Sequence, residues 1–130
     1  MLDRMDFWPT LPASDLERAK VFYAEKLGLS PLVETEAWIS YRCGSTLFQL
    51  YPTSSAGTAG HTLGGWVTDD LDATVAELRG RGVVFEDYDM PGLRTVHGIA
   101  ELGGVERAAW FRDSEGNILA ISEYLTDPTG

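Results

Sequence analysis

The sequence predicts an α+β fold in which a βαβββ module occurs twice in tandem. Two observations support this. Each of two capped helices with an apolar stripe follows a short apolar strand and precedes further short strands. In addition, residues 6–52 and 62–124 show weak internal similarity, with their helix starts in matching register. A chain of 130 residues is the usual size of one domain and is long enough to bury a sizeable core.

The first module begins with a short aromatic strand over residues 7–11. Ser14 and Glu17 then form the S-x-x-E pattern of a capping box, which predicts that a helix starts there. Gly28 suits the left-handed position that ends such a helix. The apolar stripe of the helix consists of Leu16, Ala19, Tyr23 and Leu27. Three further strands are predicted over residues 31–35, 37–42 and 46–51.

The second module follows a small, polar linker at residues 53–60. It repeats the pattern with a strand, a helix capped by Asp69–Asp72, and a second strand. The two strands are predicted over residues 62–67 and 83–86. A hairpin over residues 107–124 closes the module, and Gly116 in its turn is free to take a positive φ. Residues 87–105 have no counterpart in the first module, and their length predicts a functional or mobile loop.

Two motifs carry a resemblance to a known family. The pattern D-L-x-R-A-x-x-F-Y-x-x-x-L-G runs from Asp15 to Gly28, and W-F-x-D-x-x-G-N runs from Trp110 to Asn117. Together with the duplication, they resemble the vicinal-oxygen-chelate superfamily, which includes glyoxalase I, the bleomycin-resistance proteins and the extradiol dioxygenases. The resemblance implies one domain over residues 1–130, with module 1 at about 4–52 and module 2 at about 61–125. It also implies paired, curved mixed sheets that form a cleft, and a homodimer.

Metal-dependent members of that superfamily hold His and Glu at four cleft positions, where they grip a divalent ion. In this chain the four positions align with Trp8, Gln49, Leu63 and Ala120. Only Gln49 offers a donor, and a neutral amide alone binds a hard cation weakly. A shift of two residues would offer His61 and Ser122, which is still short of a ligand set. The expectation is therefore that the usual metal centre is absent and that no cofactor is bound.

Aromatic and amide side chains predict a different use of the cleft. Trp8 occupies a ligand position, and Gln49 needs a hydrogen-bond partner, which is either a bound molecule or a neighbouring backbone group or water. The further candidates for ligand binding are Tyr51, Trp66, Trp110 and Arg94. Core packing is the competing interpretation for the aromatic residues, and a solvated surface is the competing one for the insertion. The favoured interpretation is a metal-free protein that binds a planar or hydrophobic small molecule.

Two other functional classes stay open on the sequence. The chain is a metal-free enzyme if His97, Glu101 or Asp89 in the insertion acts as a base, and it is a lyase- or dioxygenase-type metalloenzyme if an atypical ligand set holds a metal ion. It is a scaffold if its own side chains fill the cleft. Turnover that is insensitive to chelators would indicate the first class, and the absence of both turnover and ligand binding would indicate the second.

Composition and charge limit the classes of binding partner and the cellular location that we expect for the protein. The formal net charge of −10 argues against nucleic acid and anionic membrane surfaces, because both attract basic proteins. The first residues show no signal-peptide pattern, and no apolar run reaches membrane-spanning length. Cys43 is the only cysteine, so an internal disulfide and a cysteine-based zinc site are excluded. These features predict a cytoplasmic protein.

Overall fold

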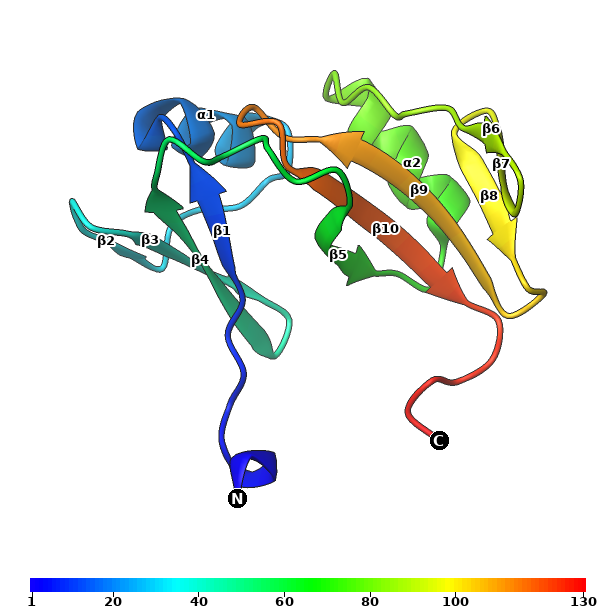
Figure 1. Ribbon diagram of the computed structural model, residues 1–130, viewed down its shortest axis with the longest axis horizontal. Coiled ribbons are helices and arrows are strands. Elements are labelled where there is room, and N and C mark those ends of the chain that lie inside the picture. Colours follow the sequence, from blue (N-terminus) through cyan, green and yellow to red (C-terminus); the bar gives the residue numbers. More distant parts are fainter. The chain divides into compact units, whose positions relative to one another are not determined.

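The computed structural model describes residues 1–130 and divides the chain into two compact units. Unit 1 comprises residues 1–58 and 114–117, and unit 2 comprises residues 59–113 and 118–130. The chain forms two α-helices and two mixed sheets, of four and six strands, which confirms the predicted α+β class (Figure 1). The turn of the closing hairpin belongs to unit 1, although the two strands that it joins belong to unit 2.

Unit 1 contains one helix and a four-stranded sheet. Its elements are η1 (Leu2–Arg4), β1 (Thr10–Ala13), α1 (Leu16–Glu25), β2 (Val33–Glu34), β3 (Ile39–Cys43) and β4 (Thr46–Pro52). The strand order is β1-β4-β3-β2, with β1 parallel to β4 and the other pairs antiparallel. The first strand therefore begins three residues later than predicted, and the other strands lie where the sequence placed them to within a few residues.

The core of unit 1 lies between α1 and its sheet. Tyr23 of α1 is fully buried, and its ring lies 5.5 Å from the ring of Tyr41 and 6.0 Å from that of Phe48. Because side chains alternate along a strand, Gln49 and Tyr51 of β4 point to the opposite face. The predicted helix stripe is thus correct at its centre, where Ala19 and Tyr23 are completely inaccessible.

The start of α1 differs from the predicted capping box. Asp15 is the N-cap, and its carboxylate accepts a hydrogen bond from the backbone N–H of Arg18 at 3.0 Å. Ser14 instead donates its hydroxyl to Glu115, which also accepts the backbone N–H of Asp15 at 2.9 Å. The predicted capping box between Ser14 and Glu17 is therefore wrong, because the N-cap is one residue later, at Asp15, and Glu115 from a distant turn accepts the backbone N–H of that residue.

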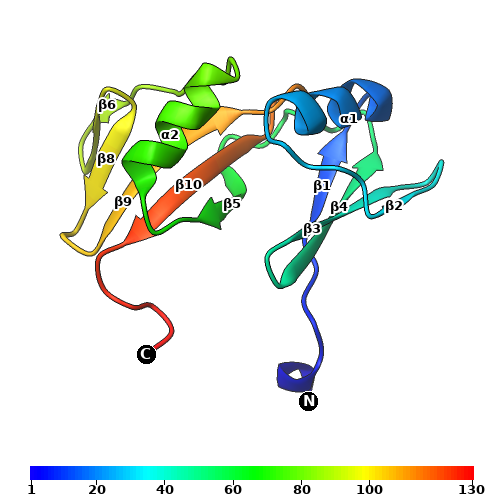
Figure 2. The same cartoon turned by 180° about the vertical axis from the view of Figure 1, so that it is seen from behind.

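Unit 2 contains one helix and a six-stranded sheet. Its elements are β5 (Thr62–Val67), α2 (Leu71–Gly80), β6 (Asp89–Met90), β7 (Leu93–Val96), β8 (Ile99–Leu102), β9 (Glu106–Arg112) and β10 (Ile118–Tyr124). The strand order is β5-β10-β9-β8-β7-β6, and only β5 and β10 pair in parallel. Asp70 caps α2, as predicted, and α2 packs across β9 and β10 (Figure 2). Neither α-helix combines the length and apolar character that crossing a bilayer requires.

The insertion is a folded part of the unit 2 sheet, so the predicted long loop is wrong. It forms β6, β7 and β8, and β8 pairs with β9 over residues 106–109. The strand predicted at residues 83–86 is reduced to one bridge, between Phe85 and Phe111. The physical reason is competition for one edge, since β8 already satisfies the backbone groups along most of β9.

Candidate functional site

Two grooves lie on opposite faces of the unit 2 sheet. The first, on the face away from α2, has a volume of about 340 Å³, and we call it the small-residue groove. It is lined by Thr62, Gly64, Gly65, Trp66, Val67, Glu106, Ala108, Trp110, Ala120, Ser122 and Tyr124. The second, on the α2 side, has a volume of about 1020 Å³, and we call it the hairpin groove because the β6–β7 hairpin forms one wall.

Strand alternation decides which residues face the small-residue groove. The carboxylate of Glu123 accepts the backbone N–H of Leu71 at the start of α2, at 2.7 Å, so Glu123 faces the helix. Its neighbours Ser122 and Tyr124 on β10 therefore face the groove. On β9, Arg107 pairs with Asp72 of α2 at 3.0 Å, which turns the adjacent Ala108 and then Trp110 towards the groove.

The floor of this groove is made of residues with little or no side chain. Gly65 of β5 lies opposite Ala120 of β10, and Ala108 of β9 lies opposite Ser122 on the other side. A Cβ atom at Gly65 would lie 2.4 Å from the carbonyl oxygen of Ala120, so this backbone approach requires glycine. The result is a shallow surface on which a flat molecule can approach the sheet closely.

Aromatic and acidic side chains border the floor. Trp110 is partly exposed, and its ring meets that of Tyr88 edge to face, with centroids 5.6 Å apart and an interplanar angle of 74°. Glu106 is the only charged residue among the lining residues. The groove therefore combines a stacking surface with a single negative charge.

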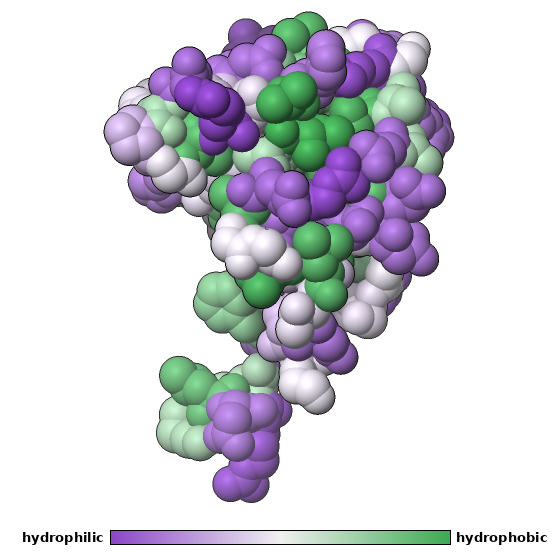
Figure 3. Space-filling model, turned by 90° about the vertical axis from the view of Figure 1, so that its right-hand side faces the viewer, coloured by the Kyte–Doolittle hydropathy of each residue, from purple (hydrophilic) through white to green (hydrophobic).

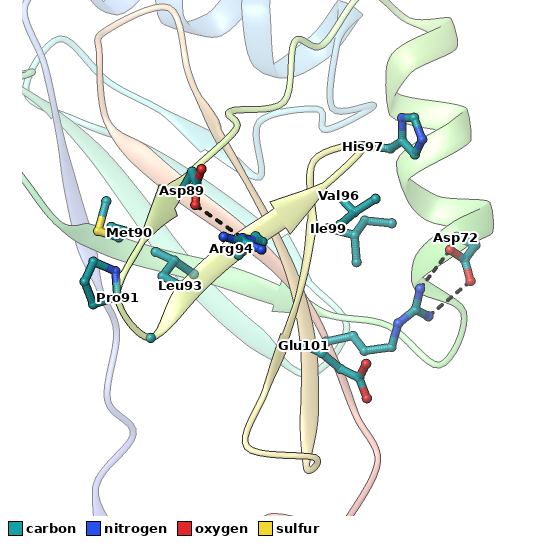
Figure 4. Close-up of a pocket in the computed structure, with 12 residues that line it drawn as sticks. Asp72, Asp89, Met90, Pro91, Leu93, Arg94, Val96, His97, Ile99 and Glu101 are labelled. Atoms are coloured by element: carbon teal, nitrogen blue, oxygen red, sulfur yellow. Dashed lines mark hydrogen bonds and ion pairs between the residues drawn. The ribbon is translucent and has the colours of Figure 1, made fainter.

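The hairpin groove carries two ion pairs around an apolar centre (Figure 4). Arg107 donates from both terminal nitrogens to Asp72, at 3.1 and 3.0 Å, and Arg94 pairs with Asp89 at 3.2 Å. The hydrogen bond from Arg107 lowers the pKa of Asp72. Val96 and Ile99 lie between the two pairs (Figure 4). Figure 3, which faces the β6–β8 end of unit 2, shows hydrophobic atoms exposed among hydrophilic ones.

The candidate site residues that were predicted in unit 2 do not lie in one place but in two different grooves. Trp66 and Trp110 are both among the residues that line the small-residue groove, but Trp66 pairs with Ile121, so its ring turns to the α2 side of the sheet and stacks on the buried Phe111 at 6.3 Å. Arg94, His97 and Glu101 line the hairpin groove on the other face of the sheet. No hydrogen bond or ion pair joins His97 to Glu101, so they do not form an assembled acid–base pair.

The remaining candidates belong to unit 1. Gln49 and Tyr51 share the face of β4 that points away from α1, and their register partners on β1 are Thr10 and Pro12. Trp8 precedes β1 and is 51% exposed. Sequence reasoning missed Glu106, Ala108 and Tyr124. The alternation of Glu106, Ala108 and Trp110 along one strand is the signal that points to the first two of these.

Comparison with known proteins places this geometry in a family. Residues 7–121 match the model of the Glyoxalase/Bleomycin resistance protein/Dioxygenase superfamily. The chain belongs to this superfamily. No curated protein sequence matches it.

Solved structures of the superfamily share the fold. A glyoxalase/bleomycin resistance protein/dioxygenase from Alicyclobacillus acidocaldarius is 18% identical, with a TM-score of 0.73 over 95% of this chain and 94% of that one. The bleomycin resistance determinant encoded on transposon Tn5 is 19% identical, with a TM-score of 0.72 over 93% of this chain and 98% of that one. Lactoylglutathione lyase from Agrobacterium tumefaciens is 16% identical, with a TM-score of 0.69 over 92% of this chain and 93% of that one. At these identities the likeness concerns the fold alone.

The positions that bind metal in metal-dependent superfamily members do not fit a divalent cation here. Leu63 sits at the bulge in β5, where the pairing with β10 shifts by one residue. Ala120 has no donor, and the neighbouring Gly65 cannot be given a side chain without displacing the backbone. No group of three or more His, Cys, Asp or Glu side chains is placed to hold a metal ion. The donor set at the family positions is thus a single amide, that of Gln49.

Proposed function

We propose that the protein binds a small planar ligand, neutral or cationic, in the small-residue groove without the help of a metal ion. One observation carries the proposal: a floor of glycine, alanine and serine lies beside the partly exposed indole of Trp110. The groove volume of about 340 Å³ falls in the range of small-molecule sites.

The physical basis is contact area and charge. A flat ring can lie against a floor without bulky side chains and bury its apolar face there, which contributes about 25 cal/mol for each Å² removed from water. Trp110 adds a π surface that attracts rings and cations. Glu106 and the net charge of −10 disfavour anions at this groove.

The name of one relative by fold agrees with a binding role. The protein encoded on transposon Tn5 is a bleomycin resistance determinant, and its structural likeness covers 93% of this chain. Resistance to a small molecule is compatible with the binding role that we propose for this chain.

Proflavine, a planar cation, tests the proposal by fluorescence titration. The wild-type protein is expected to bind it, and Trp110→Ala is expected to weaken binding about 10-fold or more because an aromatic wall is lost. Trp38→Ala is the matched control, since Trp38 lies in unit 1 and does not line the groove. The divalent anion 1,5-naphthalenedisulfonate should bind more weakly than proflavine.

Three results would contradict the proposal. They are the absence of proflavine binding, equal affinity of wild type and Trp110→Ala, and loss of binding on treatment with EDTA. The last result would mean that a metal ion takes part in the site.

We also propose that the protein is a homodimer, as the family resemblance implies. Several large apolar side chains near the N-terminus are exposed, among them Phe7 at 87%, and such surface is commonly covered by a partner. The exposed set is Met1, Leu2, Met5, Phe7 and Trp8. Light scattering is expected to give twice the mass of the chain, and Phe7→Ser is expected to shift the equilibrium towards the monomer. A monomeric wild-type protein at high micromolar concentration contradicts this.

A further inference from the structure

We infer that Tyr88 is a positioning residue of the small-residue groove, through which the inserted strands control the orientation of the Trp110 indole. The inference rests on the proposed function of that groove. Tyr88 does not line the groove, so it acts through Trp110 and not by touching the ligand.

The contact between the two rings is specific. Their centroids lie 5.6 Å apart at 74°, an edge-to-face arrangement that aromatic pairs prefer. Tyr88 is the only aromatic ring in contact with Trp110. The other side of the indole borders the groove, where the neighbours on the floor are alanine, glycine and serine. The indole therefore packs against one ring, that of Tyr88, on the side away from the groove floor.

Tyr88 is itself held firmly by β7. Its backbone N–H donates to the hydroxyl of Thr95 at 2.8 Å, and its carbonyl accepts the backbone N–H of Thr95 at 2.9 Å. The hydroxyl of Thr95 donates to the carboxylate of Asp87 at 2.8 Å. That carboxylate also accepts the backbone N–H of Gly98 at 3.0 Å. Tyr88 is thus fixed to the inserted hairpin on both sides of its backbone.

A second link ties the same segment to the backbone of Trp110. The backbone N–H of Glu86 donates to the carbonyl of Trp110 at 2.7 Å. The carboxylate of Glu86 accepts from Nε of Arg112 at 2.8 Å. The backbone of Trp110 is therefore anchored by Glu86, and its ring by Tyr88. The insertion, which has no counterpart in the first module, thereby sets one wall of the groove.

Fluorine NMR of the protein labelled with 5-fluorotryptophan tests the link without any ligand. The Trp110 resonance is assigned with Trp110→Phe. Tyr88→Leu is expected to shift or broaden this resonance and to leave those of Trp8 and Trp38 in place. Tyr88→Phe keeps the ring and is expected to restore the wild-type spectrum. An unchanged Trp110 resonance in a folded Tyr88→Leu protein overturns the inference.

Proflavine titration then connects the link to binding. Tyr88→Leu is expected to weaken proflavine binding about 3- to 10-fold, which is the size expected for one aromatic pair. In the Trp110→Ala background the same change is expected to have no further effect. If Tyr88→Leu and Trp110→Ala weaken binding independently, Tyr88 does not act through Trp110.

The two proposals fail in different ways. A wild-type protein that binds no proflavine overturns the proposed function, while the fluorine spectrum still decides whether Tyr88 orients Trp110. If Tyr88→Leu fails to fold, Thr95→Val replaces it, because that change removes the hydroxyl contacts that hold Tyr88 and keeps the ring. A Thr95→Val protein with wild-type spectrum and affinity then counts against the inference.

Discussion

Arg18 and Glu115 form a two-point ion pair although 97 residues separate them in the chain. Nε of Arg18 donates to one carboxylate oxygen at 2.9 Å, and Nη2 donates to the other at 3.0 Å. The Glu115 side chain is completely buried, whereas that of Arg18 is 53% exposed. Because Glu115 also accepts the backbone N–H of Asp15, one carboxylate holds the first turn of α1 against the turn between β9 and β10.

The first prediction concerns this carboxylate. Glu115→Gln is expected to lower the free energy of unfolding by about 1–3 kcal/mol, because the guanidinium of Arg18 and the backbone N–H of Asp15 lose a buried, charged acceptor. Glu17→Gln is the matched control, since Glu17 is the residue that the sequence pattern assigns to the cap and the structure leaves exposed. Urea denaturation of both variants measures the difference. If both variants lose the same free energy of unfolding, the result would support the predicted capping box with Glu17 and contradict the structure.

The second prediction is the pH dependence of that contribution. Burial raises the pKa of Glu115, but hydrogen bonds from Arg18, Ser114 and the backbone of Asp15 together outweigh it and lower the pKa from 4.5 to about 2. A carboxyl group whose pKa is lower in the folded state stabilises the fold above its unfolded pKa. The contribution is therefore full above about pH 4.5 and is lost as the pH falls towards 2.

The measurement compares wild type with Glu115→Gln by urea denaturation between pH 2 and pH 7. The gap in unfolding free energy between the two proteins is expected to be constant at neutral pH and to narrow below about pH 4.5. A gap that does not change with pH would show that the charge of Glu115 contributes nothing.

The third prediction concerns the floor of the small-residue groove. Gly65→Ala is expected to destabilise the protein by about 1–3 kcal/mol, because the added methyl group overpacks the contact with β10. Gly64→Ala is the control, since a Cβ atom there meets nothing within 4 Å. Its effect on stability is expected to stay within about 0.5 kcal/mol. Thermal melts of the two variants that coincide would show that β5 moves away from Ala120 without cost.

The fourth prediction concerns the hydroxyl of Tyr41 in the core of unit 1. The residue is fully buried, its ring stacks on Phe48 at 5.1 Å, and its hydroxyl has no hydrogen-bond partner. Burial, with a smaller contribution from Glu34, raises the pKa of Tyr41 to about 12. Tyr41→Phe keeps the ring and removes an unsatisfied polar group, so it is expected to be neutral or to stabilise by about 1 kcal/mol.

Thermal and urea denaturation measure the effect of Tyr41→Phe. Tyr51→Phe is the control, because Tyr51 is exposed and its hydroxyl is free to bind water. A loss of more than about 1 kcal/mol in Tyr41→Phe would indicate that a buried water satisfies the hydroxyl.

Local patterns in the sequence were sufficient for most secondary structure. The strand at Thr62–Val67 and the Asp70 cap follow from hydrophobic periodicity and from side chains that bond to their own backbone neighbours. Gly28 and Gly116 take positive φ values of 70° and 82°, as their turns require. These features depend on residues a few positions apart, and a sequence records such neighbours directly.

Contacts between distant segments were not predictable in the same way. Glu17 lies in the first sequence motif and Glu115 in the second. The motifs do not show which of the two carboxylates reaches the start of α1. Likewise, periodicity marks residues 83–86 as strand-like, but β8 takes most of the edge of β9 with which they would pair.

The sequence by itself determined the fold class, the two helices and the superfamily to which the chain belongs. Only the tertiary structure decided that Glu115 closes α1, that the insertion extends a sheet, and that Tyr88 meets Trp110. The physical reason is that helix and strand propensities are set by near neighbours, whereas ion pairs, strand partners and ring contacts depend on which distant segments the fold brings together.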